Sequence, residues 1–369
     1  MIKCDEVIKE LEKLAPLSLA ESWDNVGLLI GNREQKVKNI MVTLDINYEV
    51  ITEAVEKKVD LIISHHPIIF KPLKKITEDD LLGKMVRILV KNNISVYAAH
   101  TNLDICQGGL NDLFASKLQL KNIKVLEVLQ KQKLKKIVVF IPEGYEDSVR
   151  QAMTNAGAGW IGDYSDCTYT CKGIGTFRPL EGTNPFVGKQ GKIEKVNEYR
   201  LETVVPENKI SDVVQSMIKA HPYEEVAYDV YPLEIEGKAI GLGRIGELDK
   251  QTTFAEFINI VKSILNTTHV QYIGNKQSIV SKIAVCTGSG GDLIPSCLKQ
   301  NADVYVTGDI KYHQAQLAQE MGLNIIDAGH YQTEYIVVSF LAEYIRNIFH
   351  QKDICIFETE CNRNIIHTL

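Results

Sequence analysis

The nine residues 59–67, VDLIISHHP, indicate both the fold class and the position of a functional site. Val59–Ile63 is a mostly apolar run, typical of a strand buried in a sheet. His65 and His66 follow at its carboxyl end, where open α/β sheets bind their ligands. Pro67 removes a backbone donor and favours an extended conformation at His66, which stiffens the segment. Taken alone, the pair also fits two surface histidines in a loop.

Strand and helix patterns alternate on both sides of this stretch. The expected strands are 39–44, 59–63 and 94–98, and the expected helices are 48–58, 80–91 and 110–118. Continuous apolar strands that alternate with helices are typical of a mostly parallel sheet covered on both faces. The first part of the chain therefore predicts an α/β fold.

The last part of the chain repeats this alternation. Strands are expected at 283–286, 304–307 and 324–326, followed by a long helix at 331–348. The two ends therefore predict two halves of one bipartite outer α/β domain, residues 1–128 and 236–369.

The middle of the chain has a different element order. Residues 131–233 predict the order β-α-β-β-α-β, the ferredoxin-like arrangement, which closes into its own compact unit. We expect an inserted ferredoxin-like domain at 129–235. The glycine-rich segment 237–246, GKAIGLGRIG, is expected to be the linker that returns to the outer domain.

Composition and charge exclude several classes of protein. The chain has 369 residues, 45% of them hydrophobic and 24% charged, with a net charge of −6. That length predicts two or three domains. The acidic balance argues against a general nucleic-acid binder. No run of 18 apolar residues predicts a membrane span, and no signal-peptide pattern is found at the N-terminus, so we expect a cytoplasmic protein.

The eight cysteines are dispersed, and none forms a C-x-x-C pair. Free thiols are the expected state in a reducing cytoplasm. Two pairs, Cys167 with Cys171 and Cys355 with Cys361, are close in sequence. A structural zinc site needs four ligands in two close pairs, so a cysteine metal site is disfavoured, and the role of these four residues is open.

Two further groups of polar residues resemble the histidine pair in their placement. His100 and Asp104 follow the strand 94–98, although Asp104 also fits the start of a turn. His330 and Glu334 are four residues apart at the start of the long helix, so they share one helix face. They also fit an ordinary surface pair. The motif H-E-x-x-H is absent, so a zinc metalloprotease is not supported.

Together these positions predict a metal site of three imidazoles and two carboxylates. The candidate ligands are His65, His66, Asp104, His330 and Glu334. This donor set suits two divalent ions of Zn, Mn, Fe or Ni better than Ca or Mg. Two ions about 3.5–4 Å apart can share a water and lower its pKa, which gives a nucleophile for hydrolysis. His100 and His313 are candidate acid–base residues.

Two other motifs carry weaker signals. The turn 287–292, TGSGGD, follows a strand and precedes a helix, so its amides could hold an anion. It lacks the ending of a P-loop, and a tight turn is the favoured interpretation. The segment 221–225, HPYEE, contains a further histidine, but its place between a helix and a strand favours a shaped turn.

Five motifs of the chain resemble those of one known family, the Nif-three-like proteins, also labelled GTP cyclohydrolase 1 type 2 homologues. They are WDNVGL (23–28), SHHPIIF (64–70), HTNLD (100–104), TGDIKYH (307–313) and DAGHYQTE (327–334). The resemblance implies a two-metal site on the five ligands named above, with Glu334 bridging the ions. It also implies a toroidal homohexamer built from dimers. The segment 221–233 resembles the PII/CutA-like insertion of the longer bacterial members.

Three functions are compatible with these features. The first is a metal-dependent hydrolase acting on a nucleotide or a similar small phosphorylated molecule, which the open two-metal ligand set and the family label favour. The second is a non-enzymatic metal-binding regulatory or assembly protein whose inserted domain binds an effector. The third, a nucleic-acid scaffold, is disfavoured by the net charge of −6.

Overall fold

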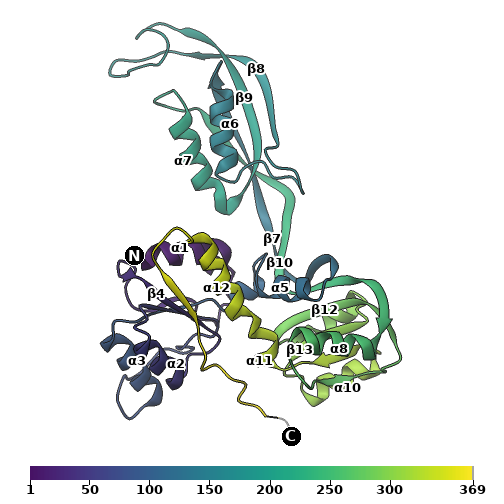
Figure 1. Cartoon of the computed structure of the whole chain (residues 1–369). Helices are drawn as coiled ribbons and strands as arrows, with labels where there is room; N and C mark the ends of the chain where they lie inside the picture. The colour runs from purple at the N-terminus through teal and green to yellow at the C-terminus, as the bar shows by residue number, and fades with distance from the viewer. Residues whose placement is uncertain (368–369) are drawn as a thin grey trace. The chain divides into compact units, whose positions relative to one another are not determined.

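The structure is a computed structural model that describes residues 1–367. The chain forms two compact units (Figure 1). The outer unit joins residues 1–129 to the C-terminal part of the chain from Ile240 onward, and the inserted unit is Gln130–Ala239. Among the described residues, every helix is too short or too polar to cross a lipid bilayer.

The first sheet of the outer unit has five strands in the order β15-β4-β5-β6-β2. They are β15 (Cys355–Glu358), β4 (Asn39–Thr43), β5 (Leu61–Ser64), β6 (Ser95–Ala98) and β2 (Gly27–Ile30). β15, β4, β5 and β6 are parallel to one another, and the edge strand β2 is antiparallel to β6. The mostly parallel sheet predicted from the alternation of elements is therefore present.

Helices cover both faces of this sheet, which explains why β5 is apolar on both sides. Leu61 and Ile63 pack into a core with α1 (Cys4–Leu14) and α12 (Ile336–Ile348). Ile62 points the other way, into a core with α2 (Tyr48–Glu56) and α3 (Leu81–Lys91). The side chains of Asn47 and Asp80 cap the first turns of α2 and α3.

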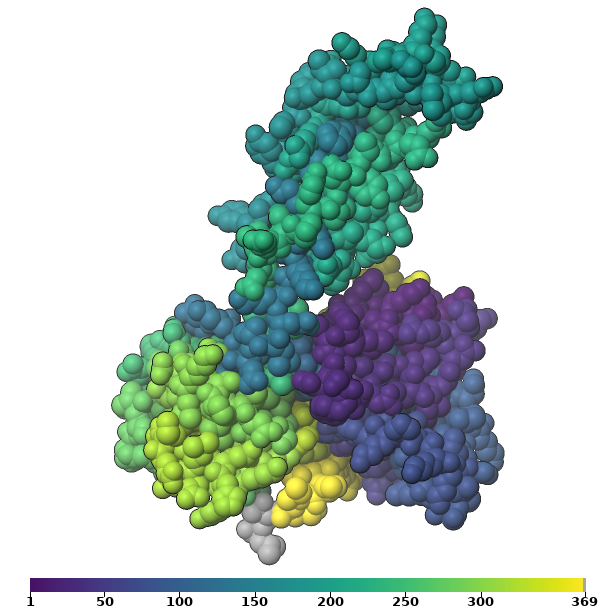
Figure 2. All heavy atoms as spheres, turned by 180° about the vertical axis from the view of Figure 1, so that it is seen from behind, coloured from purple at the N-terminus to yellow at the C-terminus, as the bar shows by residue number. Residues whose placement is uncertain are grey.

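The C-terminal part of the chain returns to this N-terminal sheet. β15 pairs with β4, and the Asn362 side chain accepts hydrogen bonds from Thr43 Oγ1 and from the backbone N–H of Leu44. In Figure 2 the C-terminal residues, coloured yellow, lie against segments coloured purple and blue. The first and last parts of the sequence therefore build one structure.

The second sheet belongs to the other half of the outer unit. Its order there is β11-β14-β13-β12-β10-β7. The strands are β11 (Gln271–Ile273), β14 (Asn324–Asp327), β13 (Val304–Gly308), β12 (Ile279–Ser289), β10 (Tyr228–Thr253) and β7 (Lys121–Pro142). β12, β13 and β14 are parallel, whereas β10 and β11 are antiparallel to their neighbours β12 and β14.

Shorter helices pack around this second sheet or join the two halves. They are α4 (Thr101–Ile105), α5 (Leu110–Lys117), α8 (Phe254–Ile264), α9 (Ile294–Lys299), α10 (Tyr312–Glu320) and α11 (His330–Glu334). The single long helix expected at 331–348 is divided into α11 and α12. At the junction the Val338 N–H donates to the Tyr335 carbonyl, three residues back, which tightens the helix locally.

The inserted unit has the element order β7, α6 (Glu146–Asn155), β8 (Thr168–Phe177), β9 (Glu194–Pro206), α7 (Ile210–Ala220), β10. Its strand order is β10-β7-β9-β8, and β9 is antiparallel to both β7 and β8. Its own core is formed by residues of β7, β9 and the two helices, among them Val139, Met153 and Met217.

The segment 237–246 carries the chain from the inserted unit back to the outer unit, as expected, because the boundary between the units falls at Ala239–Ile240, but it does so as part of a strand. It lies inside β10, where Arg244–Glu247 pairs with β12. A Cβ on Gly241 would collide with the Glu127 carbonyl, and Gly243 has a φ of +60°. These glycines therefore allow close approach of backbones and a left-handed conformation within a strand.

Candidate metal centre

The register of the first sheet brings two of the sequence motifs together. In the parallel pair β5–β6, Ser64 lies opposite Ala98. His65 and His66 therefore leave the sheet beside His100, and the imidazole centroids of His65 and His66 lie 5.2 Å and 5.4 Å from that of His100. Asp104 stands on the short helix that follows.

The third motif approaches from the other half of the outer unit. His330 and Glu334 are the first and last residues of α11, so both face the same side of this short helix. The imidazole centroids of His66 and His330 are 5.5 Å apart. The structure thus brings all five predicted ligands, together with His100, into one cluster.

Glu334 is buried at the centre of this cluster, and its two oxygens face different neighbours. Oε2 lies 2.9 Å from His66 Nε2 and 3.0 Å from His330 Nε2. Oε1 lies 3.9 Å from His65 Nε2, which is itself 3.7 Å from Asp104 Oδ1. The cluster therefore divides into two sets of donor atoms that share one carboxylate.

Several of these atoms are buried and lack a hydrogen-bond partner among residues 1–367. They are His65 Nε2, Asp104 Oδ1 and Glu334 Oε2. Oε2 is close to two imidazole nitrogens, but the alignment is not that of a hydrogen bond. Buried polar atoms are rarely left unpaired, because the loss of hydration is costly. Converging, unpaired N and O donors fit a cation between them, and His66, His330 and Glu334 offer atoms close enough to hold one ion.

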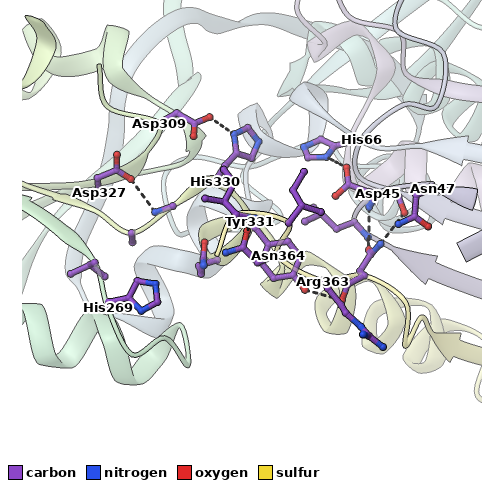
Figure 3. Close-up of a pocket in the computed structure, with 18 of the residues that line it drawn as sticks. Asp45, Asn47, His66, His269, Asp309, Asp327, His330, Tyr331, Arg363 and Asn364 are labelled. Atoms are coloured by element: carbon purple, nitrogen blue, oxygen red, sulfur yellow. Dashed lines mark hydrogen bonds and ion pairs between the residues drawn. The ribbon is translucent and has the colours of Figure 1, made fainter. Parts of the chain in front are cut away.

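Each imidazole of the cluster is fixed from behind by an oxygen. Asp45 accepts from His66 Nδ1 at 2.7 Å, and Asp309 accepts from His330 Nδ1 at 2.7 Å (Figure 3). His65 Nδ1 donates to the Ala99 carbonyl at 2.8 Å. In all three residues Nε2 is left as the nitrogen that faces the cluster, the arrangement that orients histidines for metal binding.

The carboxylates Asp24, Asp45 and Asp309 did not emerge from the sequence as site residues. Asp24 and Asp309 lie within motifs that we singled out, WDNVGL and TGDIKYH, so a signal was present. In the second motif the sequence pattern predicts His313 as the functional residue. His313 is exposed on α10, its ring lies against Tyr312, and it lines neither of the two pockets beside the cluster. The predicted catalytic role of His313 stays a prediction.

The acidic neighbours change the protonation of the cluster. Burial alone would lower the pKa of His66, but the carboxylates of Asp45 and Glu334 outweigh it and raise this pKa to about 10. The Glu334 carboxylate, 3.0 Å from His330 Nε2, raises the pKa of His330 to about 9. Burial raises the pKa of Asp104. Burial acts in the same direction on Glu334, but the three histidines around it hold its pKa well below the usual range.

His100 forms a separate pair with Asp24. Its Nδ1 donates to Asp24 Oδ1 at 2.9 Å, and Thr101 Oγ1 donates to the other oxygen. Burial would raise the pKa of Asp24, but these hydrogen bonds lower it to about 2. Asp24 is therefore an ionised acceptor, which leaves His100 Nε2 free to accept or donate a proton.

Two pockets of about 720 Å³ each meet at the cluster. Asp45, His66 and His330 line both. The pocket drawn in Figure 3 also contains Arg363, which is the only lysine or arginine among residues 1–367 that lines either pocket.

The second pocket has aromatic walls beside His100. Trp23 is 61% exposed and Phe70 is 47% exposed, and their rings stand edge-on to the His100 imidazole at centroid distances of 5.9 Å and 5.7 Å. Large exposed aromatic side chains at the mouth of a pocket are typical of a surface that binds a ligand.

The glycine turn 287–292 serves as a tight turn, the favoured interpretation. The backbone N–H groups of Thr287, Gly288 and Gly290 donate to the side chains of Asn111, Thr333 and Thr307, respectively. These three amides are therefore not available to an anion. Gly288 has a φ of +66°, and a Cβ there would collide with Glu334 Oε1, so the glycine leaves space for the central carboxylate.

Comparisons with known proteins place the whole chain among close relatives. The model of the family described as Duf34/NIF3 (NGG1p interacting factor 3) matches residues 2–365. A GTP cyclohydrolase 1 type 2 homolog of Bacillus subtilis (strain 168) is 47% identical over 326 residues, covering 88% of this chain and 87% of the relative. One from Halalkalibacterium halodurans is 44% identical over 362 residues, covering 98% and 96%.

Solved structures share the fold over the full length. The crystal structure of a Bacillus cereus protein related to NIF3 superposes with a TM-score of 0.90 at 39% identity and covers 100% of this chain and 99% of that chain. The Staphylococcus aureus protein SA1388 gives a TM-score of 0.74 at 31% identity, with the same coverage.

Proposed function

Because this chain belongs to the Duf34/NIF3 family, we propose that it binds two divalent metal ions and is a metal-dependent hydrolase of a nucleotide or a similar small phosphorylated molecule. His65, Asp104 and Glu334 Oε1 would hold one ion. His66, His330 and Glu334 Oε2 would hold the other. Mixed imidazole and carboxylate donors suit Zn, Mn, Fe or Ni.

The observation that carries this proposal is the position of Glu334, whose two oxygens face two separate groups of donors. A pair of ions would supply an activated water near neutral pH. The names of the relatives, GTP cyclohydrolase 1 type 2 homologs, support hydrolysis of a nucleotide ring.

The proton transfers of such a reaction need a group other than the metal ligands. His100 is suited to this role, because Asp24 holds its Nδ1 proton and leaves Nε2 directed at the pocket side. Its imidazole accepts a proton when neutral and returns it when charged. His313 is the second candidate from the sequence.

The two pockets suggest how a nucleotide would lie. A planar base would stack on Trp23 and Phe70, since aromatic side chains bind nucleobases by offset stacking. The phosphates would reach the other pocket, where Arg363 supplies a guanidinium group.

The first test separates metal binding from turnover. We expect the purified protein to hold two transition-metal ions per chain by elemental analysis and to hydrolyse at least one member of a nucleoside triphosphate panel with added Mn or Zn. His330→Ala should lose metal and turnover. His100→Ala should keep the metal and lose turnover by about 100-fold or more.

The variant His313→Ala tests, in the same assay, whether His313 acts as the second predicted acid–base residue. Metal content below one ion per chain in the purified, metal-loaded protein would contradict the metal site. Full occupancy without turnover on any substrate would contradict the hydrolase.

Full occupancy without turnover would instead support a metal-binding regulatory or assembly protein. The observation that favours this alternative is the inserted unit with its own core, whose βαββαβ order and antiparallel pairing support a ferredoxin-like, effector-binding domain. We also propose that the chain assembles as a toroidal homohexamer. Light scattering of the protein as it elutes from a sizing column would test this by measuring the mass of the assembly.

A further inference from the structure

The inserted unit contains a pocket of about 290 Å³ that the proposed function does not use. It lies between the end of β8, the segment 178–193, the strand β9 and the turn that follows α7. Its walls are aromatic and aliphatic: the ring centroids of Phe177 and Phe186 lie 6.2 Å and 6.0 Å from that of Tyr223. Its polar groups include three carboxylates, Glu198, Glu224 and Glu225, and none of the described residues that line it is a lysine or arginine.

Glu198 is the central carboxylate of this pocket. Only 9% of the residue is exposed, and Oε1 accepts a hydrogen bond from the Tyr223 hydroxyl at 3.1 Å. Among the described residues, no basic nitrogen lies within 4 Å of the carboxylates of Glu198, Glu224 or Glu225. A largely buried carboxylate without a positive partner is unfavourable unless a ligand supplies the charge.

The strands beside Glu198 make room for its carboxylate. Glu198 lies opposite Gly173 in the β8–β9 pair, and a Cβ on Gly175 would collide with Glu198 Oε2. Gly175 on β8 therefore leaves the space that the Glu198 carboxylate occupies. Glycine weakens a strand, so its presence here has a local structural reason.

The segment HPYEE, which we interpreted as a shaped turn, builds the opposite wall. His221 Nε2 donates to the Phe140 carbonyl at 3.0 Å, and His221 Nδ1 accepts from the Tyr223 N–H at 3.1 Å. These two bonds fix the turn that carries Tyr223. Glu224 accepts from the Asn184 N–H and so ties the segment 178–193 to the turn.

We propose that this pocket binds a small organic cation, with a quaternary ammonium or guanidinium group that contacts the rings of Phe177, Phe186 and Tyr223 and pairs with Glu198. Aromatic faces attract such weakly hydrated cations, and the carboxylate supplies the opposite charge. A small, strongly hydrated divalent ion would make no use of the three rings.

The experiment measures binding of defined probes to the full-length protein by calorimetry. Choline and agmatine are the cationic probes, and 3,3-dimethyl-1-butanol is the uncharged analogue of choline. We expect saturable binding of at least one cation, no binding of the alcohol, and a loss of affinity of about tenfold or more in Glu198→Gln. Phe186→Ala should weaken binding as well.

Glu202→Gln is the matched control on the same strand, because Glu202 pairs with Lys136 and Arg200 and does not line the pocket. It should bind the cation with unchanged affinity. Three results would overturn the proposal. The first is no saturable binding of either cation, and the second is an affinity for the cation in Glu198→Gln equal to that of the unchanged protein. The third is competition between Mn²⁺ and the organic cation that is seen in the unchanged protein and disappears in Glu198→Gln. Far-ultraviolet circular dichroism of each variant shows whether the unit is folded.

Discussion

Four histidines of the outer unit have an oxygen bonded to Nδ1 and present Nε2 to a common space. For His66, His100 and His330 that oxygen belongs to an aspartate. A carboxylate behind an imidazole fixes the tautomer, orients the ring and makes the nitrogen more basic. These aspartates are therefore the residues whose substitution changes the cluster without removing a donor atom from it.

Asp309→Asn tests this role at the residue scale. We expect a loss of metal affinity of about 10- to 100-fold, because the amide cannot supply the charge that makes His330 a strong ligand. Competition with a fluorescent chelator measures the affinity. Asp353→Asn is the control, since Asp353 is exposed and pairs only with Lys38. Equal affinity of the two variants would mean that Asp309 does not act through His330.

The protonation of the histidines predicts a pH dependence of metal binding. With pKa values of about 10 for His66 and about 9 for His330, both imidazoles carry a proton at pH 7 without metal. A ligand nitrogen must be deprotonated, so binding releases protons. We expect release of about two protons per chain at pH 7, one from each imidazole, and an affinity that falls roughly tenfold per pH unit for each proton as the pH is lowered.

Calorimetry in two buffers of different protonation enthalpy counts the released protons. A binding enthalpy that does not depend on the buffer would contradict this prediction.

At the scale of elements, two glycines set the position of Glu334. Gly329, with a φ of +85°, precedes α11, and Gly288, with a φ of +66°, lies beside the Glu334 carboxylate. Both conformations are unfavourable for residues with a Cβ. A short helix of five residues is thus held in place by a turn from the neighbouring sheet.

Gly288→Ala should lose metal binding, because its Cβ would displace Glu334 Oε1. Gly322→Ala is the matched control: its φ is +75°, and nothing lies within 4 Å of the added Cβ. Both variants should lose about 1–2 kcal/mol of unfolding free energy from backbone strain, but only Gly288→Ala should lose metal. Urea unfolding and elemental analysis give the two readouts, and full metal content in Gly288→Ala would contradict the argument.

At the scale of the molecule, a buried arginine joins the two halves of the outer unit. Arg244, on β10, donates to both oxygens of Asp112 at 2.7 Å and 2.9 Å and to the carbonyls of Gly243 and Cys106. Asp112 and Cys106 belong to the first half of the sequence. The buried guanidinium is thus paired with a carboxylate and hydrogen-bonded to carbonyls from both halves.

Arg244→Met should destabilise the protein by about 3–5 kcal/mol, since it leaves the Asp112 carboxylate without its positive partner and removes the guanidinium donors from the Gly243 and Cys106 carbonyls. Arg346→Met should cost less than about 1 kcal/mol, because the Arg346–Glu358 pair is exposed. Urea unfolding of the chelator-treated protein measures both. Similar costs for the two variants would mean that the Arg244 network does not hold the halves together.

The amino-acid sequence by itself determined the elements whose signals are local. Apolar runs such as Val59–Ile63 predicted the strands of a mostly parallel sheet, and their carboxyl ends directed attention to His65, His66, His100 and Asp104. Adjacent residues and fixed helical spacing are readable without knowledge of the fold, because periodicity alone decides which side chains share a face.

Only the tertiary structure decided which distant residues meet. Asp24 lies 76 residues before its hydrogen-bond partner His100. β15, near the end of the chain, joins a sheet whose other four strands all end at or before Ala98. The glycines of 237–246 favoured a linker, and the chain does return to the outer unit there, but only the structure shows that these glycines allow close backbone contacts inside β10. Such contacts depend on strand order and packing between segments far apart in the chain, and no local pattern of charge or hydrophobicity records them.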